Sequence, residues 1–312
     1  MTHANKFHDL RKISHVRQST VLFLLYVLMS VLPVFCLVAS TDAAQKNIFV
    51  EKNSSISDSG AIPFLSENFK QLPERQISSD NANMIYAQYT QPTSRYAHGI
   101  LGDSIEAEQL VVVKDGRIYV HTLGKQYVFE DIKPRLFDVD NDGQLEIVTI
   151  RTHVTKGAGI MIYKIVNNEL TEFAWVDEIG TPNRWLNIAA IYDLDSDGSV
   201  ELAWIQTPHI GGVMKVARIQ AGRLIALAES SGYSNHSVGE RNLCLSVVTQ
   251  TEKATILYVP SQDRGEIAGF QFTGGSFLKT ESIQQKVNFA SSLASQHDFT
   301  HVVQGEEYCL VP

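Results

Sequence analysis

DVDNDGQLEI, residues 138–147, and DLDSDGSVEL, residues 193–202, are two acidic segments that share one pattern. In both, aspartates stand at positions 1, 3 and 5, a glycine follows at position 6, and a glutamate at position 9 leads into an apolar run. The second segment begins 55 residues after the first. Two copies of one pattern at a fixed distance indicate an internal repeat.

The sequence around the two acidic segments repeats as well. PRLFDVDNDGQLEIVTIRTHVTKGAGIMIYKIVNNELTEFAWV aligns with NIAAIYDLDSDGSVELAWIQTPHIGGVMKVARIQAGRLIALAE. Each copy predicts a strand, the acidic loop, a strand, a loop with a histidine, a strand, a tight turn and a strand. A four-stranded meander repeated every ~40–50 residues is typical of a propeller blade.

The rest of the chain also reads as short strands. Runs rich in Val, Ile, Tyr and Phe are separated by Gly, Asn and Asp turns, and no long helical period is evident. Residues 95–132 and 232–281 predict two further, more divergent blades. The C-terminal strands and an N-terminal strand at residues 83–91 would form a fifth blade, which closes the ring and removes exposed sheet edges.

We therefore expect an all-β fold over residues 81–312, a β-propeller of about five four-stranded blades whose ring is closed by an N-terminal strand. A two-sheet sandwich is the alternative. It would leave the 55-residue repeat of the acidic segments unexplained.

The acidic segments have the composition of Ca²⁺ loops. Ca²⁺ binds roughly six to eight oxygens, and alternate carboxylates in a tight loop can supply them, with a backbone carbonyl at position 7. An EF-hand is excluded, because it needs a glutamate at position 12, where Thr149 and Trp204 stand. The alternative is that these are Asp/Gly turns without a metal. The expected ligands are Asp138, Asp140, Asp142, Gln144 and Glu146, then Asp193, Asp195, Asp197, Ser199 and Glu201.

These two blades resemble FG-GAP/VCBS-type repeats, the calcium-loop propeller blades of integrin-like and bacterial exported proteins. The resemblance spans roughly residues 95–280 and is strongest over 133–230. The Phe-Gly and Gly-Ala-Pro signature of the family name is not evident, so the resemblance concerns the type of blade. It implies an exported protein whose acidic loops bind Ca²⁺.

The N-terminus predicts export. Four basic residues precede an uncharged run, Val21–Ala39, and small residues follow at Ser40–Ala44. This pattern indicates a signal peptide over residues 1–40, with no stable membrane insertion after its removal. The alternative is an uncleaved anchor, since the run approaches the ~20 residues that span a bilayer. Residues 41–80 are polar and predict a loosely ordered leader. The expected location is periplasmic or secreted.

Charge and cysteine content restrict the partners and the chemistry. Loss of residues 1–40 removes four of 26 basic and one of 34 acidic residues, which leaves a net charge of −11. Nucleic-acid binding needs a basic footprint and is therefore not expected. Cys36 would leave with the signal peptide. Cys244 and Cys309 could pair, but two buried thiols are the expected state.

A second group of residues falls in loops that a propeller would place on the face opposite the acidic loops. Three interpretations stay open: hydrogen-bonding groups that join blades, a funnel that binds an unknown protein or a small-molecule or glycan ligand, or a metal or catalytic centre. No catalytic spacing motif accompanies the group. Its members are His98, His153, Arg184, Trp185, His209 and His236.

The sequence thus predicts an exported calcium-binding propeller that acts as a binding or scaffold module, and more readily a non-enzyme than an enzyme. The alternative is a periplasmic or secreted hydrolase or lyase that uses the histidine-bearing face. No catalytic residue can be named from the sequence, and fold alone does not decide between the two.

Overall fold

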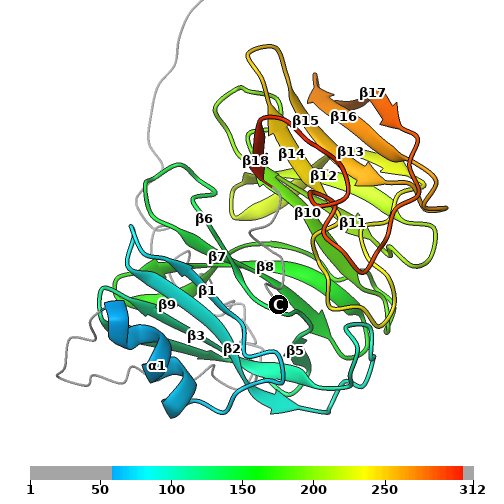
Figure 1. Ribbon diagram of the computed structural model, residues 1–312. Coiled ribbons are helices and arrows are strands. Elements are labelled where there is room, and N and C mark those ends of the chain that lie inside the picture. Colours follow the sequence, from blue (N-terminus) through cyan, green and yellow to red (C-terminus); the bar gives the residue numbers. More distant parts are fainter. Residues whose placement is uncertain (1–57, 305–312) are drawn as a thin grey trace, which may run out of the picture. The chain divides into compact units, whose positions relative to one another are not determined.

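The computed structural model describes residues 58–304, all within the unit Asp42–Pro312 (Figure 1). These residues form one helix, α1 (Asp58–Asn68), a 13-stranded sheet and a 5-stranded sheet. The fold is all-β with almost no helix, which confirms the all-β part of the expected fold class. No helix within residues 58–304 has the length and apolar character needed to cross a membrane.

The strands form four consecutive antiparallel meanders. The first contains β1 (Ile77–Asp80), β2 (Ile85–Thr93), β3 (Glu106–Lys114) and β4 (Arg117–Thr122). The second contains β5 (Tyr127–Phe129), β6 (Arg135–Phe137), β7 (Glu146–His153), β8 (Gly157–Val166) and β9 (Glu169–Val176). The third contains β10 (Leu186–Tyr192), β11 (Glu201–Gln206), β12 (Val213–Gln220) and β13 (Arg223–Ser231). The fourth contains β14 (Val247–Gln250), β15 (Thr255–Pro260), β16 (Ile267–Thr273) and β17 (Ser276–Ile283), with β18 (Val302–Gln304) beside β14.

Only a few residue pairs join the three meanders of the 13-stranded sheet. β3 pairs with β5 at Ala107 and Phe129, and β9 pairs with β13 at Trp175 and Arg223. The sheet is therefore three separate meanders that touch at single pairs rather than one continuous surface.

Successive meanders pack face to face through apolar cores. One cluster joins the first and second meanders, through residues such as Ala87, Leu110, Ile147 and Tyr163. A second joins the second and third, through residues such as Ile150, Ile160, Ile188 and Trp204. A third joins the third and fourth, through residues such as Ala203, Val216, Val248 and Phe270. Each meander between two neighbours therefore buries both of its faces, as stacked repeat units must.

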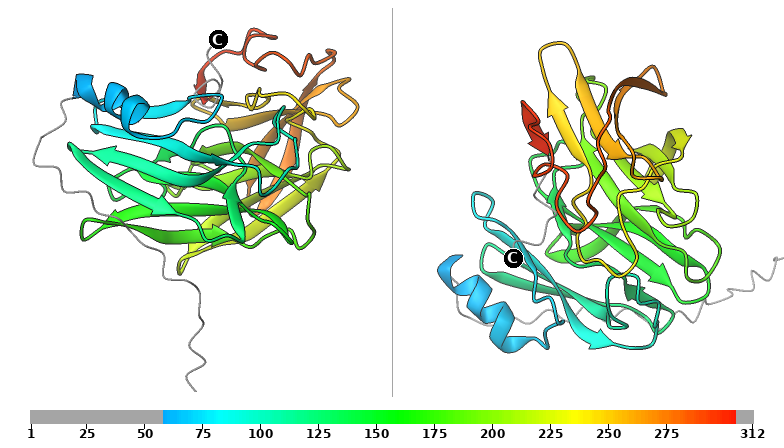
Figure 2. Two further views of the ribbon diagram at one scale, coloured as in Figure 1. Left: turned by 90° about the horizontal axis from the view of Figure 1, so that it is seen from below. Right: turned by 45° about the vertical axis from the view of Figure 1, so that its right-hand side comes forward.

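The outer faces of the first and fourth meanders are covered by segments that are not strands. Leu65 of α1 is fully buried against Tyr86 and Val111 of the first meander. Phe289 and Leu293 lie in a cluster on the fourth meander. Figure 2 shows α1 beside β1 and β2, and the segment after β17 running over the fourth meander.

The sheets described here are not closed into a ring, and the expected closure by an N-terminal strand is wrong. The strand expected at residues 83–91 is β2, and it pairs with β1 and β3. The C-terminal β18 pairs with β14. Both edges of β2 are already occupied, so no edge is left for the C-terminal strands to join.

Part of the expected leader, residues 41–80, is structured. Residues 58–80 include α1 and β1, and Leu72 is buried in the core between the first two meanders. The segment is polar overall, but a few of its apolar residues lie on one side and cover a sheet face. The expected signal peptide, residues 1–40, lies outside the described residues.

Cys244 corrects the expectation of two buried thiols, because it forms a disulfide. It is buried at the start of the fourth meander, next to Leu243 and Leu245. Cys36 and Cys309 lie outside the described residues.

The cover over the first meander gives a direct test. Leu65→Ala should lower the free energy of unfolding by about 2–5 kcal/mol, because a fully buried leucine leaves a cavity when truncated. Glu67→Ala, at an exposed site of the same helix, should change it by less than about 0.5 kcal/mol. Urea denaturation followed by fluorescence measures both. Equal midpoints for the two variants would show that α1 does not stabilise the sheet it covers.

Candidate functional site

The first acidic loop, between β6 and β7, is folded by its own carboxylates. Asp138 accepts hydrogen bonds from the backbone N–H groups of Asp142 (3.1 Å) and Gly143 (2.9 Å). Asp142 Oδ1 accepts one from the N–H of Gln144 at 2.9 Å. Gly143 has φ of 84°, which a residue with a side chain rarely adopts, so the glycine permits the reversal.

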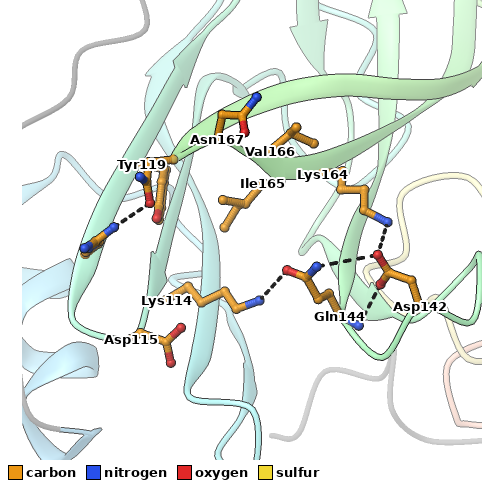
Figure 3. A pocket seen from close by; sticks show the side chains of 11 residues that line it. Lys114, Asp115, Tyr119, Asp142, Gln144, Lys164, Ile165, Val166 and Asn167 are labelled. Carbon is orange, nitrogen blue, oxygen red and sulfur yellow. Dashed lines mark hydrogen bonds and ion pairs between the residues drawn. The ribbon is translucent and has the colours of Figure 1, made fainter.

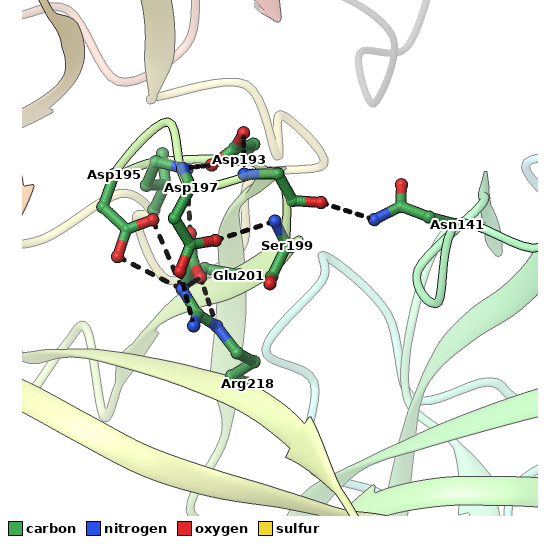
Figure 4. A network of polar contacts seen from close by, with 9 residues as sticks. Asn141, Asp193, Asp195, Asp197, Ser199, Glu201 and Arg218 are labelled. Carbon is green, nitrogen blue, oxygen red and sulfur yellow. Dashed lines mark hydrogen bonds and ion pairs between the residues drawn. The ribbon is translucent and has the colours of Figure 1, made fainter.

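The second acidic loop, between β10 and β11, repeats this geometry (Figure 4). Asp193 accepts from the N–H groups of Asp197 (3.1 Å) and Gly198 (2.9 Å), and Asp197 Oδ1 accepts from Ser199 N–H at 2.8 Å. The matching distances show that the sequence repeat is also a structural repeat.

The glutamate at position 9 is fully buried in both loops. Glu146 Oε2 accepts the backbone N–H of Val139, and Glu201 Oε2 accepts that of Leu194, both at 2.9 Å. Each glutamate thus ties the start of its strand back to the beginning of the loop. Burial raises the pKa of Glu146 to about 7 and raises that of Glu201.

A basic side chain from the third strand of each repeat enters the acidic loop. Lys164 Nζ in β8 lies 2.5 Å from Asp140 Oδ2, 2.8 Å from Asp142 Oδ2 and 3.2 Å from Glu146 Oε1. The first loop therefore holds a cation of the protein itself.

Arg218 in β12 occupies the equivalent place in the second loop. Its guanidinium contacts Asp195 at 3.2 Å, Asp197 at 2.9 Å and, through Nε, Glu201 Oε1 at 2.6 Å. Sequence reasoning missed both cations. The available signal was a basic residue after the apolar run of the third strand in each copy.

The carboxylates are close enough to share one metal ion. One oxygen each from Asp138, Asp140 and Glu146 lies within 4.8 Å of the others. The same holds for one oxygen each from Asp193, Asp195 and Asp197. Hard oxygen donors in tight loops are the ligands that Ca²⁺ prefers. Of the eight carboxylates expected as ligands, five are buried or half-buried. Gln144 and Ser199 lie at position 7 of their loops, as expected.

One buried atom favours a metal in the first loop. Glu146 Oε1 has no hydrogen-bond partner, and its contact to Lys164 Nζ is an ion pair at 3.2 Å. In the second loop, the corresponding oxygen of Glu201 accepts a hydrogen bond from Arg218. The residues of the first loop therefore fit a Ca²⁺ ion that would satisfy this oxygen, whereas those of the second are better satisfied by arginine.

The two loops are linked to each other. Asn141, at the tip of the first loop, donates a hydrogen bond from Nδ2 to the carbonyl oxygen of Gly198 at 2.8 Å. Figure 4 shows this amide directed at the second loop. One hydrogen bond therefore connects the two acidic loops directly.

Four of the six residues predicted for the opposite face come together. Trp185 lies with its ring centroid 4.8 Å from that of His236 and 6.1 Å from that of His209. His98 Nδ1 lies 2.5 Å from Glu130 Oε1, and Trp185 donates from Nε1 to the backbone oxygen of Glu130 at 2.9 Å. We call these four side chains with Glu130 the histidine cluster.

The hydrogen bonds fix the tautomers of two histidines. His236 Nε2 lies 2.8 Å from the backbone oxygen of Glu240, which can only accept, so this nitrogen carries the proton. His236 Nδ1 must then accept from His209 Nε2, which lies 2.8 Å away. His209 Nδ1 is left with a free lone pair. Burial lowers the pKa of His209 to about 4 and that of His236 to about 3, so both are neutral at pH 7.

The other two predicted residues lie apart from these contacts. His153 packs edge-on against Tyr127, with ring centroids 4.9 Å apart, and accepts the N–H of Thr155. Arg184 donates to the backbone oxygen of Asn183. Trp185 was expected to present a flat surface, but it is only 2% exposed and belongs to the core between the second and third meanders.

Sequence reasoning also missed buried carboxylates near the histidine cluster. Glu106, Glu130 and Asp131 are each no more than 3% exposed. Burial raises the pKa of Glu106 and of Glu130, and Thr152 donates to Glu130 Oε2 at 2.6 Å. The signal was the acidic pair that directly follows the apolar strand YVF.

The geometry defines a class of protein built from repeated four-stranded meanders with acidic, cation-holding loops. Residues 138–204, which contain both loops, match the model of the FG-GAP-like repeat family. Over these residues the chain is similar to an FG-GAP-like repeat, which confirms the FG-GAP part of the resemblance inferred from its acidic segments.

Other comparisons add little. No curated protein matches the chain. Among solved structures it is similar to rhamnogalacturonan lyase PL11 of Bacillus licheniformis, at 15% identity and a TM-score of 0.33. The match covers 56% of this chain and 41% of the lyase, so the chain corresponds to less than half of that protein's length.

The buried histidines predict acid sensitivity. Because the pKa values of His209 and His236 lie below the ordinary 6.5, the unfolded chain takes up protons first as the pH falls. The stability they contribute is complete above pH 6.5 and is lost as the pH falls towards 4 for His209 and towards 3 for His236. The slope is up to about 1.4 kcal/mol per pH unit for each histidine, and less for the half-exposed His209.

Urea unfolding at a series of pH values checks this. Between pH 6.5 and 4, the free energy of unfolding of the His236→Gln variant should fall less steeply than that of the wild type. Protonation of carboxylates lowers this free energy in both proteins alike, so the difference reports on His236. Parallel curves would contradict a neutral, buried His236.

Proposed function

We propose that this chain is an exported calcium-binding module of FG-GAP-like repeats that binds or positions another molecule. The observation that carries the proposal is the convergence of carboxylate oxygens in two equivalent loops, within 4.8 Å of one another in each. Carboxylates at such distances repel unless a cation compensates them. The ligands would be Asp138, Asp140, Asp142, Glu146 and the carbonyl of Gln144 in the first loop, and Asp193, Asp195, Asp197, Glu201 and the carbonyl of Ser199 in the second.

The meanders are proposed to be propeller-type blades. Their support is the repeated four-stranded order and the face-to-face cores that join one meander to the next. In this arrangement, α1 and the segment around Phe289 cover the faces that a further blade would otherwise cover.

Export is proposed on two grounds. The basic and then apolar N-terminal sequence has the pattern of a signal peptide. Cys244 is disulfide-bonded, and stable disulfides form mainly in oxidising compartments. A periplasmic or secreted location would also supply the calcium that loops of this kind need.

In the proposed calcium-bound state, the ion competes with the chain's own cations. It would share carboxylates with Lys164 in the first loop and with Arg218 in the second. Extracellular calcium modules bind with a Kd of about 10⁻⁴–10⁻³ M. The competition favours weak, reversible binding at such concentrations, and tighter binding at the first loop than at the second.

The ligand face is proposed to be the histidine cluster, with an unknown protein or a small-molecule or glycan partner. Trp185 and His236 are buried, so the accessible groups are His98 and His209, the latter with its free lone pair. Arg184 lies on the same loop as Trp185 and offers a planar fork for a carboxylate or phosphate.

An enzyme is the second candidate, and one geometric feature favours it. Glu130 orients His98, and the chain from His209 to His236 to the backbone of Glu240 orients a neutral imidazole base. A hydrolase or lyase would need such a base. If the wild type cleaves a polysaccharide, His209→Gln should abolish the cleavage and His153→Gln should retain it. If the wild type cleaves none, the enzyme candidate fails and the binding module remains.

The calcium proposal is tested by thermal unfolding. If Kd is about 0.5 mM, 5 mM Ca²⁺ should stabilise the protein by about 1.4 kcal/mol per occupied site, and chelation should remove this gain. The double variant Asp140→Ala, Asp195→Ala should lose the calcium-dependent shift. The exposed Glu252→Ala should retain it. An equal melting temperature with calcium and with chelator in the wild type would refute the proposal.

A further inference from the structure

A cavity of about 760 Å³ opens beside the first acidic loop (Figure 3). It lies between the β3–β4 turn of the first meander and the β8–β9 turn of the second. Its size falls in the range of pockets that hold a small molecule. We call it the Lys164 pocket, and its walls are formed by Lys114, Asp115, Arg117, Tyr119, Asp142, Gln144, Lys164, Ile165, Val166, Asn167 and Asn168.

The walls are mainly polar, and Tyr119, Ile165 and Val166 are their apolar and aromatic members. Tyr119 is mostly buried and Ile165 is half-buried, whereas Arg117 and Asn168 are exposed. Arg117 donates from its guanidinium to Asn168 Oδ1, so the turns of the two meanders hold each other in place. Lys114 Nζ reaches Gln144 Oε1 at 3.4 Å. The pocket is therefore built by residues from two meanders that the core between them fixes.

Charge in the pocket depends on where the ammonium of Lys164 points. Lys114 and Arg117 bring two positive charges, and Asp115 and Asp142 bring two negative ones. Lys164 lines the pocket with its side chain, but its Nζ lies 2.5–3.2 Å from three carboxylates of the acidic loop. In this position the ammonium charge pairs with the loop carboxylates.

A calcium ion in the first loop would replace the Lys164 ammonium as the partner of these carboxylates. The ion would bind Asp140 and Glu146, the same carboxylates that Lys164 contacts, and two positive charges at ~4 Å repel. Lys164 lines the pocket while its Nζ contacts the loop, so a rotation of its side chain would take the ammonium from the loop to the pocket. Asp142 would at the same time be drawn towards the ion.

We propose that calcium binding to the first loop releases Lys164 into the Lys164 pocket, where it joins Lys114 and Arg117 to bind a carboxylate-bearing small molecule. This inference rests on the calcium proposal above. It adds a ligand class, a second site and a coupling between them. Three basic groups, one with a planar fork, suit a carboxylate, and the polar mouth suits a hydroxyl-rich molecule such as an acidic sugar.

The coupling is reciprocal. If calcium tightens binding of the anion, the anion must tighten binding of calcium by the same factor, because the two binding steps form a closed thermodynamic cycle. The second loop serves as an internal control. Arg218 contacts three carboxylates in the same way but does not line the Lys164 pocket.

Isothermal titration calorimetry tests the coupling with two probes, glucuronate and glutarate. The first carries its carboxylate on a sugar ring, and the second carries carboxylates without one. Each is titrated into full-length protein freed of calcium on a chelating resin, and again in 5 mM Ca²⁺ with matched calcium in the syringe. Glucuronate should bind about 10-fold more tightly with calcium, and Lys114→Met should weaken it about 10-fold without changing calcium binding. Binding of glutarate as well would show that the carboxylate alone suffices, and its failure to bind would assign recognition to the sugar.

Matched variants separate the coupling from general effects. In Lys164→Met, glucuronate affinity should be the same with and without calcium, and calcium should bind the first loop several-fold more tightly because its competitor is gone. Arg218→Met should retain the 10-fold effect. If the wild type binds calcium but shows no calcium-dependent glucuronate binding, the inference is overturned and the calcium proposal stands. If calcium itself does not bind, both fail.

Discussion

One buried carboxylate in each repeat, Glu146 or Glu201, is the interaction on which the remaining structure depends. It accepts the backbone N–H seven residues earlier and meets the basic side chain of the third strand. A single group thus joins the acidic loop to the second and third strands of its repeat. Because an isolated buried carboxylate is costly, it must be protonated or paired with a cation, and in both loops a basic side chain of the protein pairs with it. The same glutamate therefore contributes to loop folding, to strand register and to cation binding in each repeat.

The same strands separate two kinds of chemistry. β7 begins at the buried Glu146 of the acidic loop and ends at His153, and β11 runs from Glu201 towards His209. Cation loops and the Lys164 pocket thus lie at one end of the meanders, and the histidine cluster lies at the other. Apolar clusters between the meanders fix the two ends relative to each other.

The sequence predicted the local features well and the long-range ones poorly. The repeat of acidic segments predicted the loops, the meanders and the all-β class, because glycine position and strand alternation are local properties. It did not predict that β2 would be enclosed by β1 and β3, since a strand's own residues do not name its partner. Lys164 and Arg218 were not singled out in the sequence, because only the register of β7 with β8 and of β11 with β12 brings them to the loops. The buried state of Trp185 depends likewise on how two meanders pack.

A crystal structure determined in the presence of 10 mM Ca²⁺ tests the central claim most directly, since it locates the cations themselves. The account predicts an ion among Asp138, Asp140 and Glu146, bound by oxygens at about 2.3–2.6 Å, with Lys164 Nζ moved out of the loop. A second ion beside Asp193, Asp195 and Asp197 would be weaker or partly occupied. Lys164 and Arg218 still seated on their carboxylates, with no ion in either loop, would contradict the account.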